Sequence, residues 1–544
     1  MYWSKLKPNT PPERASSECL CARIEDAHAA AWRCSGEPNL FNFSRTRASI
    51  RGVMRTSLSP NQTKHRRRKL QTFTACVLTA IVLCAAAVRA QESDLSSSAG
   101  IFIEPRRAKE SAPRVRSVPQ RTTPRRTRPR PGPTASNPKP TGKTTPALTA
   151  ESLNARAEAA IDAGRFSDAV EPLRQAVKLK PDFADAQYNL GFALYSLGRH
   201  EEAVEPLRRA AALDASDADA PVYLGAAYAK LGRHAEAAAS YEQAARLAPK
   251  NGATLAALGG EYMAAGDRDR AVEAFKRAVA LDPNDTESQF DLGEALYAKG
   301  KYAEAAEAFA HVTRVTQSNA EAFENLGDSD SALNRFADAA AAYRDAARLK
   351  PGNAEVLQKL GYALGRDKRW PEATDALKKA LALRPGDAEA AVNLAWVYNN
   401  SAQPRLSIDT LKPIVAAHPD MTAALFNLGT AYGHLAQKGA KNDAEKKTLF
   451  AQAVDTLKQV IRLKPDWPEA HNNLGVALGS LGRFKEAVAA HAEAVRLKPD
   501  YAGALFNLAY AYRKSGDKKK ALETHKRLQA INPGMAERLY PLVK

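Results

Sequence analysis

Residues 188–217 read YNLGFALYSLGRHEEAVEPLRRAAALDASD, and residues 222–251 read VYLGAAYAKLGRHAEAAASYEQAARLAPKN. The two stretches align without a gap at a distance of 34 residues. In both, glycine follows leucine, a second glycine comes seven residues later, and an alanine comes five residues after that. A fixed period of this size marks an array of repeated structural units, so it decides the fold before any single element is considered.

The same small residues recur along most of the chain. The first small position carries Gly191, Gly225, Gly259, Gly293, Gly327, Gly361, Gly429 and Gly475, with Ala157, Ala395 and Ala509 in the remaining copies. The second carries Gly164, Gly198, Gly232, Gly266, Gly300, Gly482 and Gly516. A proline closes most units, at Pro181, Pro249, Pro283, Pro351, Pro385, Pro419, Pro465, Pro499 and Pro533. These positions predict about eleven units.

Each small position has a physical reason within a pair of helices. The first lets the two helices approach closely, and the second ends the first helix, because glycine adopts a left-handed conformation at little cost. Proline ends the second helix, and Asp182, Asp466 or Asp500 just after it is expected to cap the next one. Between these marks the apolar residues fall at helical spacing. The sequence therefore predicts an all-α solenoid over residues 150–535, with a short C-terminal capping helix in residues 536–544.

This pattern resembles the tetratricopeptide repeat family, in which antiparallel helix pairs stack into a right-handed superhelix. The resemblance is specific for the fold and is nearly silent about activity. Two units depart from the pattern: unit 8 has Ala395, Ala402 and Ser407 at its small positions, and unit 9 carries an insertion near residues 437–447. Alternating charges in the insertion predict a longer, solvated helical hairpin.

Charge and cysteine content narrow the possible functions. The net charge is +19, but 27 of the 79 basic and only 9 of the 60 acidic residues lie in residues 1–150, so the repeat region is nearly neutral. Specific nucleic-acid binding by the repeats is therefore not expected. All five cysteines lie at or before Cys84, and Cys19, Cys21 and Cys34 read as part of an unstructured extension, not as a metal site. Without a phosphate-binding loop, a His-Glu-x-x-His motif or a serine nucleophile elbow, we expect neither an enzyme nor a cofactor.

The N-terminal part of the sequence contains a predicted targeting signal. Residues 66–69 are basic, residues 73–88 are apolar, and small residues precede a cut after Ala90, as in a secretory signal over residues 54–90. The alternative is an uncleaved anchor in the inner membrane formed by residues 70–88. Met54 stands at a suitable distance before the basic cluster and is the expected start, with residues 1–53 unstructured. We expect an exported, periplasmic or secreted protein.

Residues 91–149 predict a disordered linker. They are rich in proline and arginine and carry few apolar residues, so they cannot bury enough surface to offset chain entropy. Residues 105–143 could contact anionic lipid or another polyanion, or could serve only as a solvated spacer.

The resemblance to tetratricopeptide repeats implies that the first helix of each unit lines a concave groove, with the residue two before the first small position pointing inward. Asparagine there offers a donor and an acceptor and can hold an extended peptide backbone. This row resembles the asparagine ladder in the superhelix of O-linked N-acetylglucosamine transferase. The matching positions are Asn189, Asn325, Asn393, Asn427, Asn473 and Asn507, with Asp291 in the same position of unit 5; Tyr223, Ala257 and Lys359 break the row.

Two further groups complete the predicted groove. Aromatic residues are expected as anchors at Tyr188, Phe192, Phe290, Tyr362, Trp396, Phe426, Phe506 and Tyr510, although some of them belong to the core between units. An acidic patch of Asp291, Glu294, Glu324 and Asp328 is expected to attract a basic peptide, with this chain's own arginine-rich linker as one candidate.

The leading interpretation is a scaffold that binds protein segments in the groove, outside the cytoplasm. A structural tether, held through the basic linker to a membrane or polyanion, is the second interpretation. An accessory subunit of a glycosyltransferase or of a secretion machine is the third, and it differs from the first only in the partner.

Overall fold

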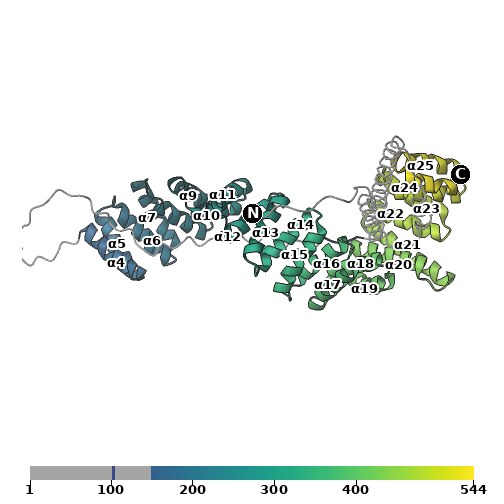
Figure 1. The fold of residues 1–544 in the computed structure, drawn as a ribbon, viewed down its shortest axis with the longest axis horizontal. Helices are drawn as coiled ribbons and strands as arrows, with labels where there is room; N and C mark the ends of the chain where they lie inside the picture. The colour runs from purple at the N-terminus through teal and green to yellow at the C-terminus, as the bar shows by residue number, and fades with distance from the viewer. Residues whose placement is uncertain (1–100, 105–148) are drawn as a thin grey trace, which may run out of the picture. The chain divides into compact units, whose positions relative to one another are not determined.

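A computed structural model of the chain describes residues 101–104 and 149–544. Within these residues, all regular structure is helical, and 23 helices, α4 to α26, follow one another. Each helix packs against the next in sequence, and the first helices of most adjacent pairs also pack against each other. Figure 1 shows this succession of neighbouring helices from α4 to α25. The predicted all-α solenoid of about eleven helix pairs is confirmed.

The eleven pairs have regular lengths. Their first helices are α4 (Ala150–Asp162), α6 (Ala184–Ser196), α8 (Asp219–Lys230), α10 (Gly252–Ala264), α12 (Thr286–Ala298), α14 (Ala320–Ala332), α16 (Ala354–Arg366), α18 (Ala388–Asn400), α20 (Thr422–Lys438), α22 (Pro468–Ser480) and α24 (Ala502–Lys514). Their second helices are α5 (Phe166–Leu179), α7 (His200–Leu213), α9 (His234–Leu247), α11 (Arg268–Leu281), α13 (Tyr302–Val315), α15 (Phe336–Leu349), α17 (Trp370–Leu383), α19 (Pro404–Ala417), α21 (Asp443–Leu463), α23 (Phe484–Leu497) and α25 (Lys518–Ile531). Helix α26 (Pro533–Val543) follows and packs on α24 and α25.

Where the first small position is glycine, it leaves room for a large side chain from the second helix. A Cβ atom added at Gly293 would lie 2.7 Å from Cε1 of Phe309, whose ring is fully buried. The same relation joins Gly259 to Phe275, and Gly475 to His491. Because atoms cannot pack at such distances, any larger residue here would push the paired helices apart.

The second small position ends the first helix of the pair in a left-handed conformation. All seven glycines predicted there have φ between 71° and 97°. In three units a residue with a side chain takes the same conformation: Asn334, Lys368 and Ala402, with φ of 58° to 61°. The turn is therefore kept even where the glycine is lost, at the cost of backbone strain.

The prediction that Asp182, Asp466 and Asp500 cap the following helices is wrong. The N-cap residues there are Phe183, Trp467 and Tyr501, which accept no capping hydrogen bond. The capping position lies two residues after the proline position, where other units carry Asn251, Asp285, Asn319, Asn353 and Asp387, all of which accept from the backbone of the next helix. The aromatic residues are instead covered by a preceding lysine, as in Lys180 over Phe183.

The insertion in unit 9 lengthens both of its helices. Helix α20 has 17 residues and α21 has 21, whereas α18 has 13 and α19 has 14. Over residues 101–104 and 149–544, no helix is both long and apolar enough to cross a membrane. The predicted signal segment and linker lie outside the described residues, apart from residues 101–104 and Thr149.

Candidate peptide-binding surface

Two asparagines of the predicted row hold a short segment of this same chain. Asn427 Oδ1 accepts from the backbone N–H of Ile101 at 2.7 Å, and Asn427 Nδ2 donates to the Ile101 carbonyl at 2.7 Å. Asn393 makes the same two bonds with Ile103, at 2.7 Å and 2.8 Å. Each carboxamide thus satisfies both backbone groups of one residue, and consecutive units bind alternate residues of the segment.

The residue between these two turns its side chain the other way, as expected for an extended chain. The ring of Phe102 stacks on Trp396, with centroids 4.2 Å apart and ring planes 8° apart. It also meets Tyr362 at 4.6 Å. A Cβ atom added at Gly365 would lie 2.7 Å from Phe102, so the ring occupies space that only glycine leaves. We call Tyr362, Gly365, Asn393, Trp396 and Asn427 the segment-binding surface.

The rest of the segment lies at the margin of the core. Ile101 and Ile103 are half-buried and pack against the apolar cluster of units 8 to 10. Glu104 is exposed. Burial raises the pKa of Tyr362; the charge of Glu104 adds to this, and the nearby Arg366 opposes it. Arg366 Nη1 donates to the Tyr362 hydroxyl at 2.7 Å, which orients the phenol at the edge of the surface.

The other predicted asparagines contact side chains of the repeats. Asn189 Nδ2 donates to Asn154 Oδ1 at 3.0 Å, and Asn507 Nδ2 donates to Asn472 Oδ1 at 3.1 Å. Asn473 Nδ2 donates to Thr430 Oγ1 at 3.3 Å. Asn325 is buried, and its carbonyl accepts from Ser329. Within the part of the chain that the structure describes, Asn393 and Asn427 are the members of the row that bond to residues 101–104, and the binding role of the row as a whole stays a prediction.

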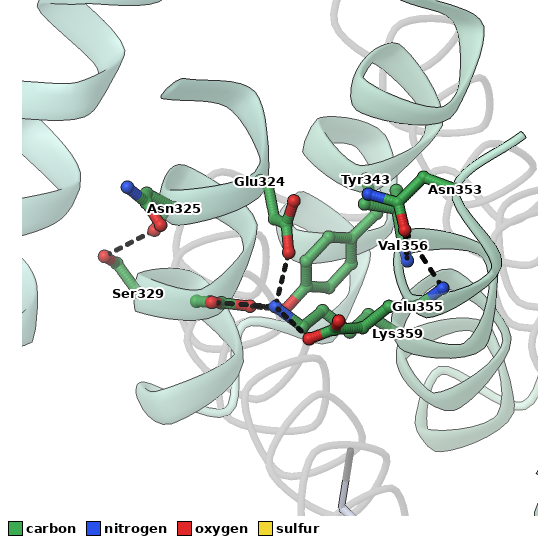
Figure 2. A network of polar contacts seen from close by, with 9 residues as sticks. Glu324, Asn325, Ser329, Tyr343, Asn353, Glu355, Val356 and Lys359 are labelled. Carbon is green, nitrogen blue, oxygen red and sulfur yellow. Dashed lines mark hydrogen bonds and ion pairs between the residues drawn. The ribbon is translucent and has the colours of Figure 1, made fainter. Parts of the chain in front are cut away.

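The predicted acidic patch contains an internal cation. Lys359, which breaks the asparagine row, donates from Nζ to Glu324 at 2.7 Å and to Asp328 at 3.0 Å, and Figure 2 shows the cluster. The lysine side chain is 3% exposed. Burial alone would lower the pKa of Lys359, but Asp328 and Glu324 outweigh it, and the net shift is upward. Two of the four acids are therefore already paired with a lysine of this chain.

The remaining two acids lie one unit earlier. Asp291 is 8% exposed, and Glu294 is half-buried. The hydroxyl of Tyr343 also donates to Asp328, at 2.8 Å, so this carboxylate has two partners within the protein. Binding of a basic peptide by the patch stays a prediction.

Of the predicted aromatic anchors, Trp396 and Tyr362 contact the segment. The others contact the repeats: Tyr188 and Phe192 stack on each other, Phe290 packs on Phe309, and Phe426 stacks on Trp467. Phe506 is half-buried against the C-terminal cluster. Tyr510 is 36% exposed.

Sequence inspection missed three members of this region. The Ile-Phe-Ile-Glu stretch at 101–104 is a short apolar run at the start of a proline- and arginine-rich segment. This local change in composition could have marked it as a segment that packs on the repeats. Gly365 stands outside the periodic small positions, which was a second signal. The pairing of Lys359 with Asp328 had no signal, because it depends on how adjacent units stack.

Comparison with known families covers most of the repeat region. Tetratricopeptide repeat models match residues 366–431 and 480–542, and residues 324–388 and 442–502. The model of the cilia and flagella-associated protein 70 C-terminal domain matches residues 153–326. Comparison with curated proteins finds no significant match.

Solved structures with matching segments include one described as a tetratricopeptide repeat protein. The crystal structure of YrrB, described as a TPR protein with an unusual peptide-binding site, is 28% identical, covers 34% of this chain and 95% of its own, and has a TM-score of 0.32. The crystal structure of MamA is 27% identical over 30% of this chain and 97% of its own, with a TM-score of 0.29. The structure of Naa15/Naa10 bound to HypK-THB is 16% identical over 71% of this chain and 64% of its own, with a TM-score of 0.37.

The helix pairs, the small residues that let them pack, and the matches of the repeat models agree with one another. Members of such families act through their surfaces, by binding other proteins. The chain belongs to the tetratricopeptide repeat family.

Proposed function

We propose that this protein is a non-catalytic scaffold that binds extended peptide segments through the segment-binding surface. The observation that carries the proposal is the paired bonding of Asn393 to Ile103 and of Asn427 to Ile101. A carboxamide that both donates to and accepts from one residue's backbone recognises an extended chain whatever its side chain. Two such contacts in consecutive units set the register of the peptide, as cross-strand pairing does in a sheet.

A peptide-binding measurement tests the proposal. The full chain with residues 101–104 replaced by Gly-Ser-Gly-Ser, which we call the vacated variant, frees the surface of its own segment. The probe is a fluorescent synthetic peptide of residues 98–107, and fluorescence anisotropy reports its binding. We expect saturable binding that the further change of Asn393 and Asn427 to alanine abolishes, because both backbone anchors are then lost.

Methylation of single peptide nitrogens isolates the backbone contribution. N-methylation at the positions of Ile101 and Ile103 removes the two N–H donors and is expected to weaken binding by about 5- to 30-fold for each, which corresponds to a loss of about 1–2 kcal/mol per hydrogen bond. N-methylation at the position of Phe102 is the matched control. The proposal fails if the doubly methylated peptide binds as tightly as the parent peptide.

We further propose that the protein acts outside the cytoplasm. The support is the sequence of residues 54–90, with its basic, apolar and small-residue regions. N-terminal sequencing of the protein from the cell is expected to begin at Gln91. A mature chain that retains residues 70–88 would support the membrane-anchored alternative. Activity of a fused reporter that works only in the cytoplasm would contradict export.

A further inference from the structure

The segment on the segment-binding surface is part of the same chain. Ile101–Glu104 is joined to Thr149, at the start of the solenoid, by roughly 44 residues, which reach up to about 150 Å when fully extended. The surface that meets it lies far along the sequence, at separations of 290 and 326 residues for the two asparagines. The contact is therefore a tertiary one, made between a segment that precedes the solenoid in sequence and units 7 to 9.

The pocket for Phe102 is selective in size and shape. Trp396 offers a flat face at 4.2 Å, and Tyr362 closes the side at 4.6 Å. The floor is Gly365, where an added Cβ would lie 2.7 Å and 2.8 Å from two ring atoms of Phe102 and 3.4 Å from Trp396. Gly365 does not have positive φ, so its conformation does not require glycine. Glycine is required at position 365 because the ring of Phe102 fills the space where a Cβ atom would lie.

The contacts on either side of the ring define the rest of the ligand. Ile101 and Ile103 are held by their backbones, and their side chains pack at the edge of the apolar cluster of units 8 to 10. Glu104, which follows, is exposed. The surface thus fits an extended segment with an aromatic side chain between two aliphatic ones.

We infer that Ile101–Glu104 is a tethered ligand that occupies the segment-binding surface in the resting protein, and that an outside segment must displace it. The ligand class is an extended aliphatic–aromatic–aliphatic segment, read by Gly365 and Trp396 at its centre. This inference rests on the proposed function, to which it adds the occupant and the side-chain selectivity. Because its own segment is tethered nearby, the surface binds an outside segment only when that segment displaces residues 101–104.

The strength of the competition follows from the tether. A connection of about 44 residues keeps its end at an effective concentration on the order of a millimolar. A free peptide with an intrinsic dissociation constant of tens of micromolar then binds the wild-type chain on the order of 10- to 100-fold more weakly than a chain without its own segment. This ratio is the quantity to measure.

The test uses the full chain and the labelled peptide of residues 98–107 as the probe. We expect the Phe102→Ala chain to bind the probe on the order of 10- to 100-fold more tightly than the wild type, because its own segment no longer fills the pocket. We expect the Phe102→Ala/Gly365→Ala chain to lose binding, because the added methyl group takes the place of the probe's ring. A probe with alanine in place of phenylalanine is expected to bind neither chain.

Control measurements separate the possible failures. Circular dichroism and thermal unfolding check that Gly365→Ala leaves the helices intact, as a helical residue without positive φ allows. Equal affinity of the wild-type and Phe102→Ala chains would overturn the tethered ligand and leave the proposed function standing. Absence of binding by the vacated variant and by Phe102→Ala alike would overturn the proposed function itself.

A last experiment tests whether residues 101–104 bind to their own chain or to a second copy. Sedimentation velocity of the wild type is expected to show the same species over a hundredfold range of concentration. Wild-type dimers whose population rises with concentration, and that Phe102→Ala abolishes, would show that the occupant comes from a second copy and would overturn the intrachain ligand.

Discussion

Lys359 and Asp328 form an ion pair between the first helices of adjacent units, α16 and α14, with 3.0 Å between Nζ and a carboxylate oxygen. Their side chains are 3% and 6% exposed. An ion pair so far from water stabilises the fold only as long as both partners are present, because removal of one leaves a buried charge without compensation.

Replacement of Lys359 by methionine is therefore expected to destabilise the repeat region by about 3–5 kcal/mol. The triple change Lys359→Met/Asp328→Asn/Glu324→Gln removes both acids as well and is expected to recover most of this loss. Urea unfolding followed by circular dichroism measures both. A single variant as stable as the wild type would contradict the importance of the pair.

His491 gives unit 10 a dependence on pH. Its ring faces Gly475 at the position where Leu207, Leu377 and Leu457 stand in other units, and burial lowers its pKa to about 3. In the unfolded chain its pKa is about 6.5, so between pH 6.5 and pH 3 the unfolded state binds more protons. Stability from this group is full above pH 6.5 and falls by about 1.4 kcal/mol for each pH unit below it.

Replacement of His491 by leucine should remove this part of the acid sensitivity. The measurement is the difference in unfolding free energy between wild type and His491→Leu at pH 7 and at pH 5, which cancels the contribution of other titrating groups. We expect the leucine variant to gain on the wild type by about 2 kcal/mol on going from pH 7 to pH 5. A difference independent of pH would contradict the low pKa.

The close packing of helix pairs can be tested with one methyl group. Gly293→Ala places a Cβ 2.7 Å from the buried ring of Phe309, and we expect a loss of about 1–3 kcal/mol. Gly433→Ala is the matched control, since nothing lies within 4 Å of its added Cβ. That change should stabilise helix α20 by about 0.5–1 kcal/mol. Urea midpoints of the two variants are expected to move in opposite directions.

The strained turn of unit 8 offers a route to a more stable protein. Ala402 has φ of 58°, where other units carry glycine. Ala402→Gly should stabilise by about 0.5–1 kcal/mol, because relief of strain exceeds the entropy that glycine adds to the unfolded chain. Ala416→Gly, on the exposed face of α19, should destabilise by a similar amount. Thermal midpoints that fall for both variants would exclude strain at Ala402.

Much of the fold was accessible from the sequence, because the constraints on a repeat are local. Gly293 and Phe309 lie in one helix pair, so their spacing recurs with the period and can be read from one unit to the next. The wrong prediction of the caps has a local cause too: an aspartate stands directly after the proline, but the cap is one position further on, as at Asp285.

The candidate site was accessible only in part. The position of Asn393 and Asn427 in the repeat marked them as inward-facing, but Asn189 shares that position and bonds instead with Asn154. Period alone does not distinguish them, because the partner of each amide lies on another unit or another segment. For the same reason the sequence suggested an open acidic patch where Lys359 already pairs with Glu324 and Asp328.

The sequence by itself determined that small side chains recur every 34 residues, which suffices to specify paired helices and their stacking. Only the tertiary structure decided which surface of that stack meets Ile101–Glu104, because a contact across some 300 residues depends on the shape that many units make together. A periodic pattern encodes neighbours within and between units, while a pocket such as that of Phe102 exists only once two adjacent units have stacked and a distant segment has reached them.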